Sequence, residues 1–223
     1  MKFRMRDQLS ACVIGDHAVF LDIDADRYFR LPASLERAFL MYMRNPDSQP
    51  AVATLVASNI LVPARTGYDE PPAAIEPPTR SALEMGAPAG RWAVTAIPEV
   101  LTVLWTSRRV LSKRFRDVLQ RTAGERGRLC RSSPRPGGPA TERQALQIAL
   151  RFHHARAYCP FAPCCLPDSI ALTRFLARRG VDSRIVFGVT SEPFSAHCWV
   201  QVGDIALNET VGYARTHTVI RVV

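Results

Sequence analysis

The sequence predicts an α+β fold in two units, and three observations predict it. Short alternating apolar segments and turns occupy residues 1–66, a proline-rich stretch follows at 67–90, and long amphipathic segments precede further alternating ones in 91–223. Helices grouped before strands, rather than alternating strictly with them, indicate an α+β arrangement. With 223 residues, 47% of them hydrophobic, the chain can bury at least one substantial core.

The N-terminal unit, residues 1–66, is predicted to begin as a three-stranded sheet. Strands are expected at 12–14, 18–23 and 27–31, and Gly15 with Asp16 supplies the first turn. Alternation of apolar and polar residues, followed by turn residues, is the pattern of short half-buried strands.

Two helices are expected to cover this sheet. Pro32 can begin the first, whose apolar residues Leu35 and Phe39 recur at helical spacing, and the second ends near Asn59. Together these elements predict a compact winged-helix-like unit.

Residues 67–90 are predicted to be a linker, because Pro71-Pro72 and Pro77-Pro78 interrupt any regular period. In the unit at 91–223 a single long amphipathic helix is expected over about 100–124. Further helices are expected at about 141–157 and 166–179, followed by strands at 183–189, a hairpin at 197–207 and a last strand at 218–223.

Cys165 and His197 are the candidate reactive pair. Cys165 precedes a predicted helix whose first turn contains Pro167, and unpaired N–H groups there can lower a thiol pKa from roughly 8.5 toward about 3.5–7.5. His197 opens a predicted strand and could orient the thiolate and later protonate a leaving amine. This order suggests a thiol hydrolase, with Cys164 as the competing nucleophile.

The other cysteines suggest neither disulfides nor a metal. The chain has six cysteines without a repeated spacing, which is not a disulfide framework. Zinc binding by Cys159, Cys164 and Cys165 with His153 or His154 would match no familiar ligand spacing, so no metal and no cofactor is predicted.

Composition and charge restrict the classes of protein further. No apolar run approaches 18 residues and the N-terminus leads into polar residues, so we expect a cytoplasmic protein without a membrane span. The net charge of +9 comes mainly from residues 67–150, which hold 13 Lys and Arg against 8 Asp and Glu. Arg109, Lys113 and Arg116 would share one helix face, which predicts either a solvated face or a contact with an acidic partner or phosphate-bearing ligand.

Several separated motifs resemble one family in order and spacing. They are Cys165-Leu166-Pro167-Asp168-Ser169-Ile170-Ala171-Leu172, then Pro193-Phe194-Ser195-Ala196-His197-Cys198-Trp199-Val200, and then Leu207-Asn208-Glu209. Over about residues 95–223 the chain resembles the lasso-peptide leader peptidases, which are transglutaminase-like, papain-like cysteine proteases. The N-terminal unit is similar to the small element that such enzymes use to hold a precursor's leader peptide, here fused to the protease.

The resemblance implies a function and two partners. A Cys–His–acid triad would cut the leader from a ribosomally made precursor, and a separate asparagine-synthetase-like, ATP-dependent cyclase would join the freed core amine to a side-chain carboxylate. The third position of the triad departs from the family, because Glu209 stands where the family has Asp. Either Glu209 or the preceding Asn208 could therefore orient His197.

The leader is expected to add to a strand edge at 27–31. The candidate contacts are Arg27, Tyr28, Phe29, Arg30, Val52 and Leu55, with side chains of the leader docking between strand and helix. Two other functions remain open at this point. One is a non-catalytic adaptor that binds a leader or nucleic acid, and the other is acyl transfer to an amine by the same triad; we expect no nucleic-acid partner.

Overall fold

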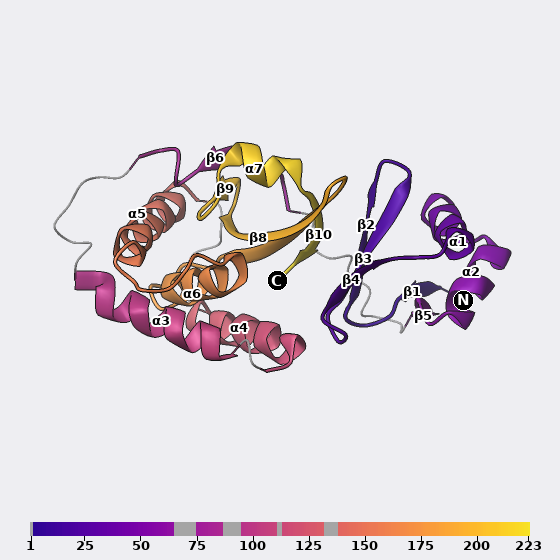
Figure 1. The fold of residues 1–223 in the computed structure, drawn as a ribbon, viewed down its shortest axis with the longest axis horizontal. Helices are drawn as coiled ribbons and strands as arrows, with labels where there is room; N and C mark the ends of the chain where they lie inside the picture. Colours follow the sequence, from indigo (N-terminus) through magenta and orange to yellow (C-terminus); the bar gives the residue numbers. More distant parts are fainter. Residues whose placement is uncertain (1, 65–74, 87–94, 111–112, 132–137) are drawn as a thin grey trace.

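The computed structural model describes residues 2–64, 75–86, 95–110, 113–131 and 138–223, which form an N-terminal sheet with its helices and a larger α+β body (Figure 1). Within these residues no helix is long and apolar enough to cross a membrane.

The N-terminal unit is built on an antiparallel sheet of order β2-β3-β4, formed by Leu9–Ile14, His17–Asp22 and Arg27–Arg30. Helices α1 (Ala33–Arg44) and α2 (Gln49–Ala57) cover one face of it (Figure 1). The sequence did not predict a second, smaller sheet, in which β1 (Phe3–Met5) pairs with β5 (Leu61–Pro63).

The larger unit contains a five-stranded sheet of order β10-β7-β8-β9-β6. Its strands are Thr218–Val222, Arg184–Ser191, Phe194–Val202, Ile205–Ala206 and Arg80–Ser81 in that order. Five helices accompany it among the described residues: α3 (Ile97–Val110), α4 (Phe115–Leu129), α5 (Pro139–Arg156), α6 (Cys165–Ala177) and α7 (Val211–Thr216).

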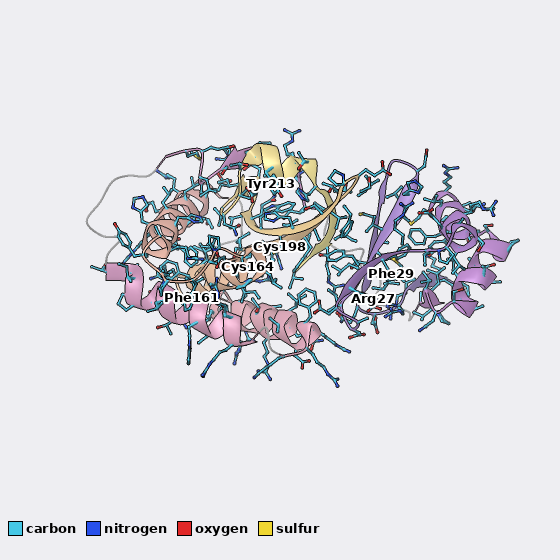
Figure 2. All side chains as sticks on the ribbon, viewed as in Figure 1. Arg27, Phe29, Phe161, Cys164, Cys198 and Tyr213 are labelled. Carbon is cyan, nitrogen blue, oxygen red and sulfur yellow. The ribbon has the colours of Figure 1, made fainter. Side chains whose placement is uncertain are left out.

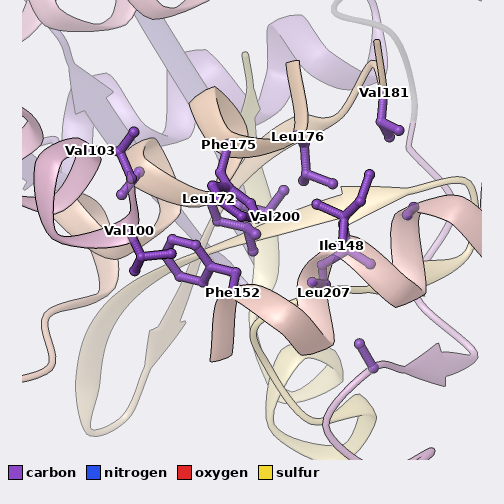
Figure 3. Close-up of a cluster of buried hydrophobic side chains, with 14 of the residues drawn as sticks. Val100, Val103, Ile148, Phe152, Leu172, Phe175, Leu176, Val181, Val200 and Leu207 are labelled. Atoms are coloured by element: carbon purple, nitrogen blue, oxygen red, sulfur yellow. The ribbon is translucent and has the colours of Figure 1, made fainter. Parts of the chain in front are cut away.

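Helix α6 lies at the centre of the larger unit. Every residue from Ser169 to Ala177 is buried, and one core cluster joins Leu172 and Phe175 to Val100 of α3, Phe152 of α5 and Val200 of β8 (Figure 3). A helix that is apolar on all sides is stable only when other elements surround it. This burial holds the first residue of α6, Cys165, against the sheet.

The N-terminal sheet has two buried faces. Phe20 and Phe29 pack towards α1 and α2, whereas Leu21 and Tyr28 belong to a cluster with Phe187 of the larger sheet. Alternate residues of a strand point to opposite faces, so β3 and β4 join two cores at once. The two units therefore share a hydrophobic core, although the predicted boundaries at residues 66 and 91 remain a prediction.

Polar contacts also join the two units. Arg221 of β10 donates to Ser10 Oγ at 2.9 Å and to Gln8 Oε1 at 3.2 Å, and Arg116 of α4 lies 3.3 Å from an oxygen of Asp24.

Two predictions about the larger unit were wrong. The single helix expected over 100–124 is two helices, and α4 begins only after Arg114, whose ψ of 131° is not helical. Arg109, Lys113 and Arg116 consequently do not share one helix face. The segment 67–90, expected to contain no packed element, contributes β6, which pairs in parallel with β9 and is followed by the fully buried Ala82.

Candidate active site

Cys165 is the first residue of α6, and Cys164 is its N-cap with extended backbone. The Asp168 side chain accepts from the Cys164 N–H at 3.3 Å, and the Arg156 guanidinium donates to the same Asp168 oxygen at 3.2 Å from each of two nitrogens. These contacts fix the turn that presents Cys165 at the positive end of the helix.

His197 lies near the start of β8, paired in register with Gly188 of β7. Its Nε2 is 2.7 Å from Glu209 Oε2, and the side chains of both residues are less than one-fifth exposed. The Glu209 backbone carbonyl accepts from Ser81 Oγ at 2.7 Å, and the other carboxylate oxygen accepts from the Thr210 N–H at 2.8 Å. The structure thus brings together the three residues that the sequence predicted as catalytic.

Aromatic rings surround the imidazole. The ring centroids of Trp199, Tyr213 and His217 lie 6.5, 5.1 and 5.6 Å from that of His197. Trp199 is fully buried, and its ring is stacked with that of His197. The two residues lie on the same face of β8, as expected for positions two apart on a strand. These rings restrict both the orientation of the imidazole and the access of water to it.

The environment of Cys165 favours the thiolate. Hydrogen bonds from Cys198 and then from His197 outweigh the opposing effect of burial and lower the pKa of Cys165 to about 4. The pKa of His197 is raised, because the effects of the Cys165 thiolate and the Glu209 carboxylate outweigh the opposing effect of burial. Cys165 and His197 are therefore suited to form a thiolate–imidazolium pair, with Glu209 on the far nitrogen of the ring.

Cys198 is a neighbour of Cys165 to which the sequence analysis assigned no role. It is buried, its Sγ lies 3.9 Å from Ser169 Oγ, and the adjacent Cys165 together with burial raises its pKa well above the usual value, so its thiol stays protonated. Figure 2 shows Cys198 and Cys164 in the middle of the larger unit. The adjacency of Cys198 to His197 in the motif was the available signal.

Asn208 does not orient the imidazole. Its Oδ1 accepts from the Val200 N–H at 2.6 Å, and its Nδ2 donates to Ser169 Oγ at 3.0 Å. The Ser169 hydroxyl in turn donates to the Cys198 carbonyl at 3.4 Å. Asn208 therefore ties the histidine strand to α6, while Glu209 faces His197.

A cavity of about 680 Å³ opens beside Cys165 and His197. Phe152, Phe161 and Leu83 supply part of its apolar lining. His153, considered above only as an unfamiliar zinc ligand, also lines the cavity. Its Nε2 donates to the Leu207 carbonyl at 2.7 Å, and burial lowers its pKa. The cavity is large enough for several side chains of an extended peptide.

The residues predicted to bind a leader fall into two groups. Arg27 and Arg30 are exposed on β4, Tyr28 and Phe29 are partly buried there, and Figure 2 shows Arg27 and Phe29 on the N-terminal sheet. Val52 and Leu55 of α2, in contrast, are 5% and 0% exposed, and Leu55 lies in the core cluster with Phe20 and Phe39. These two are thus the least accessible of the six predicted contacts, and their contact with a leader remains a prediction.

Tyr28 lies close to Cys165 and Cys198. Its ring centroid is 5.8 Å from that of Phe194 on β8, and it packs on the cluster that includes Cys165 and Cys198. The pKa of Tyr28 is raised by burial and by nearby thiolate charge, which places its hydroxyl within electrostatic range of the reactive sulfur.

Comparison with known proteins agrees with this geometry. A stretch of 49 residues is 43% identical to the microcin J25-processing protein McjB of Escherichia coli, and it covers 22% of this chain and 24% of that relative. The match thus spans about a quarter of the relative's length, and no solved structure matches the chain. The model of the transglutaminase-like superfamily matches residues 108–222, which include α6, His197 and Glu209, and the chain therefore belongs to that superfamily.

Proposed function

We propose that this protein is a cysteine protease that removes the leader peptide from a ribosomally made lasso-peptide precursor. The observation that carries the proposal is the low pKa of Cys165 at the start of α6, beside a His197 that is held by Glu209 at 2.7 Å. The similarity to a protein named for processing microcin J25 supports a peptide precursor as the substrate.

The reaction would proceed through an acyl-enzyme. The Cys165 thiolate attacks the scissile carbonyl carbon, and the backbone N–H of Cys165 is a donor for the oxyanion that forms. His197 gives its proton to the departing core amine, and the C–N bond breaks. Neutral His197 then takes a proton from water, which hydrolyses the thioester and releases the leader with a free carboxylate.

The open edge of β4 is the proposed docking strand for the leader. Among the described residues β4 pairs only with β3, so its other edge has backbone groups available for an added strand. The contact between Tyr28 and Phe194 holds this edge near Cys165. A leader bound there would bring its C-terminal end to the catalytic cysteine, and the freed core would pass to the cyclase.

The deciding experiment is mass spectrometry of a lasso precursor incubated with the full-length protein. We expect a leader and a core fragment whose masses sum to that of the precursor plus one water. Cys165→Ala should leave the precursor intact. Cys164→Ala should retain most of the activity, because Cys164 is exposed, precedes the first residue of α6, and bonds to Asp168 through its backbone N–H, which the substitution keeps. Circular dichroism checks that both variants fold alike.

Three outcomes would reject the proposal. Cleavage by Cys165→Ala at the wild-type rate would exclude the thiol mechanism. Products that incorporate an added amine instead of water would assign acyl transfer, and an uncleaved precursor that binds tightly would assign the adaptor function.

Leader docking is tested separately by calorimetry with the Cys165→Ala protein, which keeps the substrate whole. Arg27→Ala should weaken binding of a synthetic leader by roughly 5–30-fold, about 1–2 kcal/mol, as removal of one anchor usually does. Arg44→Ala, an exposed change at the end of α1, serves as the matched control. If Arg27→Ala and Arg44→Ala bind the leader equally well, the leader docks elsewhere. Tighter binding to random DNA than to the leader would favour the nucleic-acid adaptor instead.

A further inference from the structure

A second cavity, of about 280 Å³, lies where the N-terminal sheet meets the larger unit and shares no lining residue with the cavity beside Cys165. Four arginines line it: Arg116 and Arg126 of α4, Arg184 of β7 and Arg221 of β10. Three separate elements thus direct guanidinium groups to one place.

Too few carboxylates offset these four charges. Asp182 lies 3.0 Å from Arg126 and 3.8 Å from Arg184, and Asp24 lies 3.3 Å from Arg116. Among the described side chains, two carboxylates lie within 4 Å of these four guanidinium groups, which leaves a local excess of positive side-chain charge.

Arg221 is the least compensated of the four. Both hydrogen bonds from its terminal nitrogens go to neutral oxygens, on Ser10 and Gln8. Its Nε is buried and has no hydrogen-bond partner within the described part of the chain. A buried donor without a partner costs free energy, and because the other two nitrogens bond only to neutral oxygens, an anion near the guanidinium group would offset its positive charge.

The positive charge of Arg126 is also destabilised by its surroundings. The side chain is 11% exposed, and burial together with the charge of Arg184 lowers its pKa. The pKa of Arg221 is lowered by burial as well. Both guanidinium groups remain charged, since an arginine pKa starts far above neutral pH.

We propose that this cavity is a binding site for a phosphate-class anion. A phosphate has several oxygens pointing in different directions and about two negative charges, so it can accept from guanidinium groups that approach from α4, β7 and β10 together. A lone carboxylate has two oxygens in one plane and a single charge, which suits one such group. Because Arg221 also donates to Gln8 and Ser10 of the N-terminal unit, a bound anion would stabilise the interface between the two units.

The test uses the full-length protein, with inorganic phosphate and pyrophosphate as probes and sodium chloride at matched ionic strength as the reference. Calorimetry should give saturable binding of one anion per chain. At about ten times its Kd, phosphate should raise the unfolding midpoint by about 3–6 °C over chloride.

Variants connect the binding to the cavity. Arg221→Gln should weaken phosphate binding at least tenfold, and Arg184→Gln, whose side chain is 45% exposed and can be replaced without disturbing the core, should weaken it several-fold. Arg121→Gln, an exposed change on α4 outside the cavity, removes the same charge and should leave binding unchanged.

Three results would overturn the proposal. They are stabilisation by phosphate no greater than by chloride, equal loss of binding in Arg121→Gln and Arg184→Gln, and succinate binding as tightly as phosphate. The first two would reduce the cavity to a region of general positive charge, and the third would exclude a preference for phosphate.

Discussion

Glu209 Oε2 lies 2.7 Å from His197 Nε2, and this contact sets the tautomer of the imidazole. A carboxylate holds a proton on the nitrogen that faces it, so the other ring nitrogen is the one available to Cys165. The longer side chain of glutamate is accommodated because its second oxygen bonds to the Thr210 N–H and draws the carboxylate back towards its own backbone.

Loss of this carboxylate should slow cleavage strongly. We expect Glu209→Ala to reduce kcat by roughly 10³–10⁴, by analogy with loss of the orienting acid in a serine triad, and Glu209→Asp to retain activity. Removing the negative charge lowers the pKa of His197, so the alkaline limb of the pH–rate profile should move to lower pH.

The control for Glu209 is Asn208→Ala. This change breaks the link from Val200 to Ser169, so it should lower the free energy of unfolding by about 1–3 kcal/mol without moving the alkaline limb. If Asn208→Ala moved the limb and Glu209→Ala did not, the amide would be the orienting group.

The thiolate of Cys165 should depend on the thiol of Cys198. In the wild-type protein we expect iodoacetamide to label Cys165 with a rate that rises through an inflection near pH 4. Cys198→Ala removes the side-chain hydrogen bond that contributes most to the low pKa of Cys165 and should move this inflection to higher pH. Cys198→Ser keeps a donor and should hold the inflection close to that of the wild type.

Peptide mapping by mass spectrometry identifies the labelled residue in each variant. An inflection that is the same in Cys198→Ala and Cys198→Ser would mean that His197 and the helix start alone stabilise the thiolate.

Glycine at position 188 should be required for close packing around His197. A Cβ there would lie 2.7 Å from His217 Cβ and 3.0 Å from the Trp199 ring, both of which pack around His197. Gly188→Ala should therefore lower the free energy of unfolding by about 1–3 kcal/mol and reduce cleavage. Urea titration measures the first effect and precursor turnover the second.

Gly212→Ala is the matched control, because a Cβ at that position meets nothing within 4 Å. Equal effects of the two substitutions would show that close packing at Gly188 does not support the histidine.

The shared core predicts that the two units unfold together. Leu21 is 1% exposed and packs against the larger sheet, so Leu21→Ala should cost about 2–5 kcal/mol. All three tryptophans, Trp92, Trp105 and Trp199, follow residue 91, so their fluorescence monitors the larger unit. We expect the tryptophan-detected urea midpoint to fall in Leu21→Ala, although the change lies in the N-terminal sheet.

Met43→Ala, at a residue 56% exposed on α1, should leave that midpoint nearly unchanged. A tryptophan-detected midpoint insensitive to Leu21→Ala would mean that the two units unfold independently.

The local order of the elements could be predicted from the sequence, because periodicity and turn chemistry act over a few residues. Gly180, with a φ of +74°, follows α6 as its position after Arg178 and Arg179 predicted, and the hairpin at Gly203 has the positive φ that its turn requires. The break between α3 and α4 was missed, because the apolar spacing continues from one helix into the next.

The sequence by itself determined the candidate reactive pair, Cys165 and His197, since the place of Cys165 before Pro167 and the motif around His197 are both local. Tertiary structure alone decided that Glu209 rather than Asn208 faces the imidazole and that Cys198 packs in one cluster with Cys165. Asn208 and Glu209 follow β9 in a segment that is not a strand, so strand alternation does not fix which of them meets His197. The packing of distant elements decides it, because Val200 of β8 and Ser169 of α6 hold the Asn208 side chain and leave Glu209 facing His197.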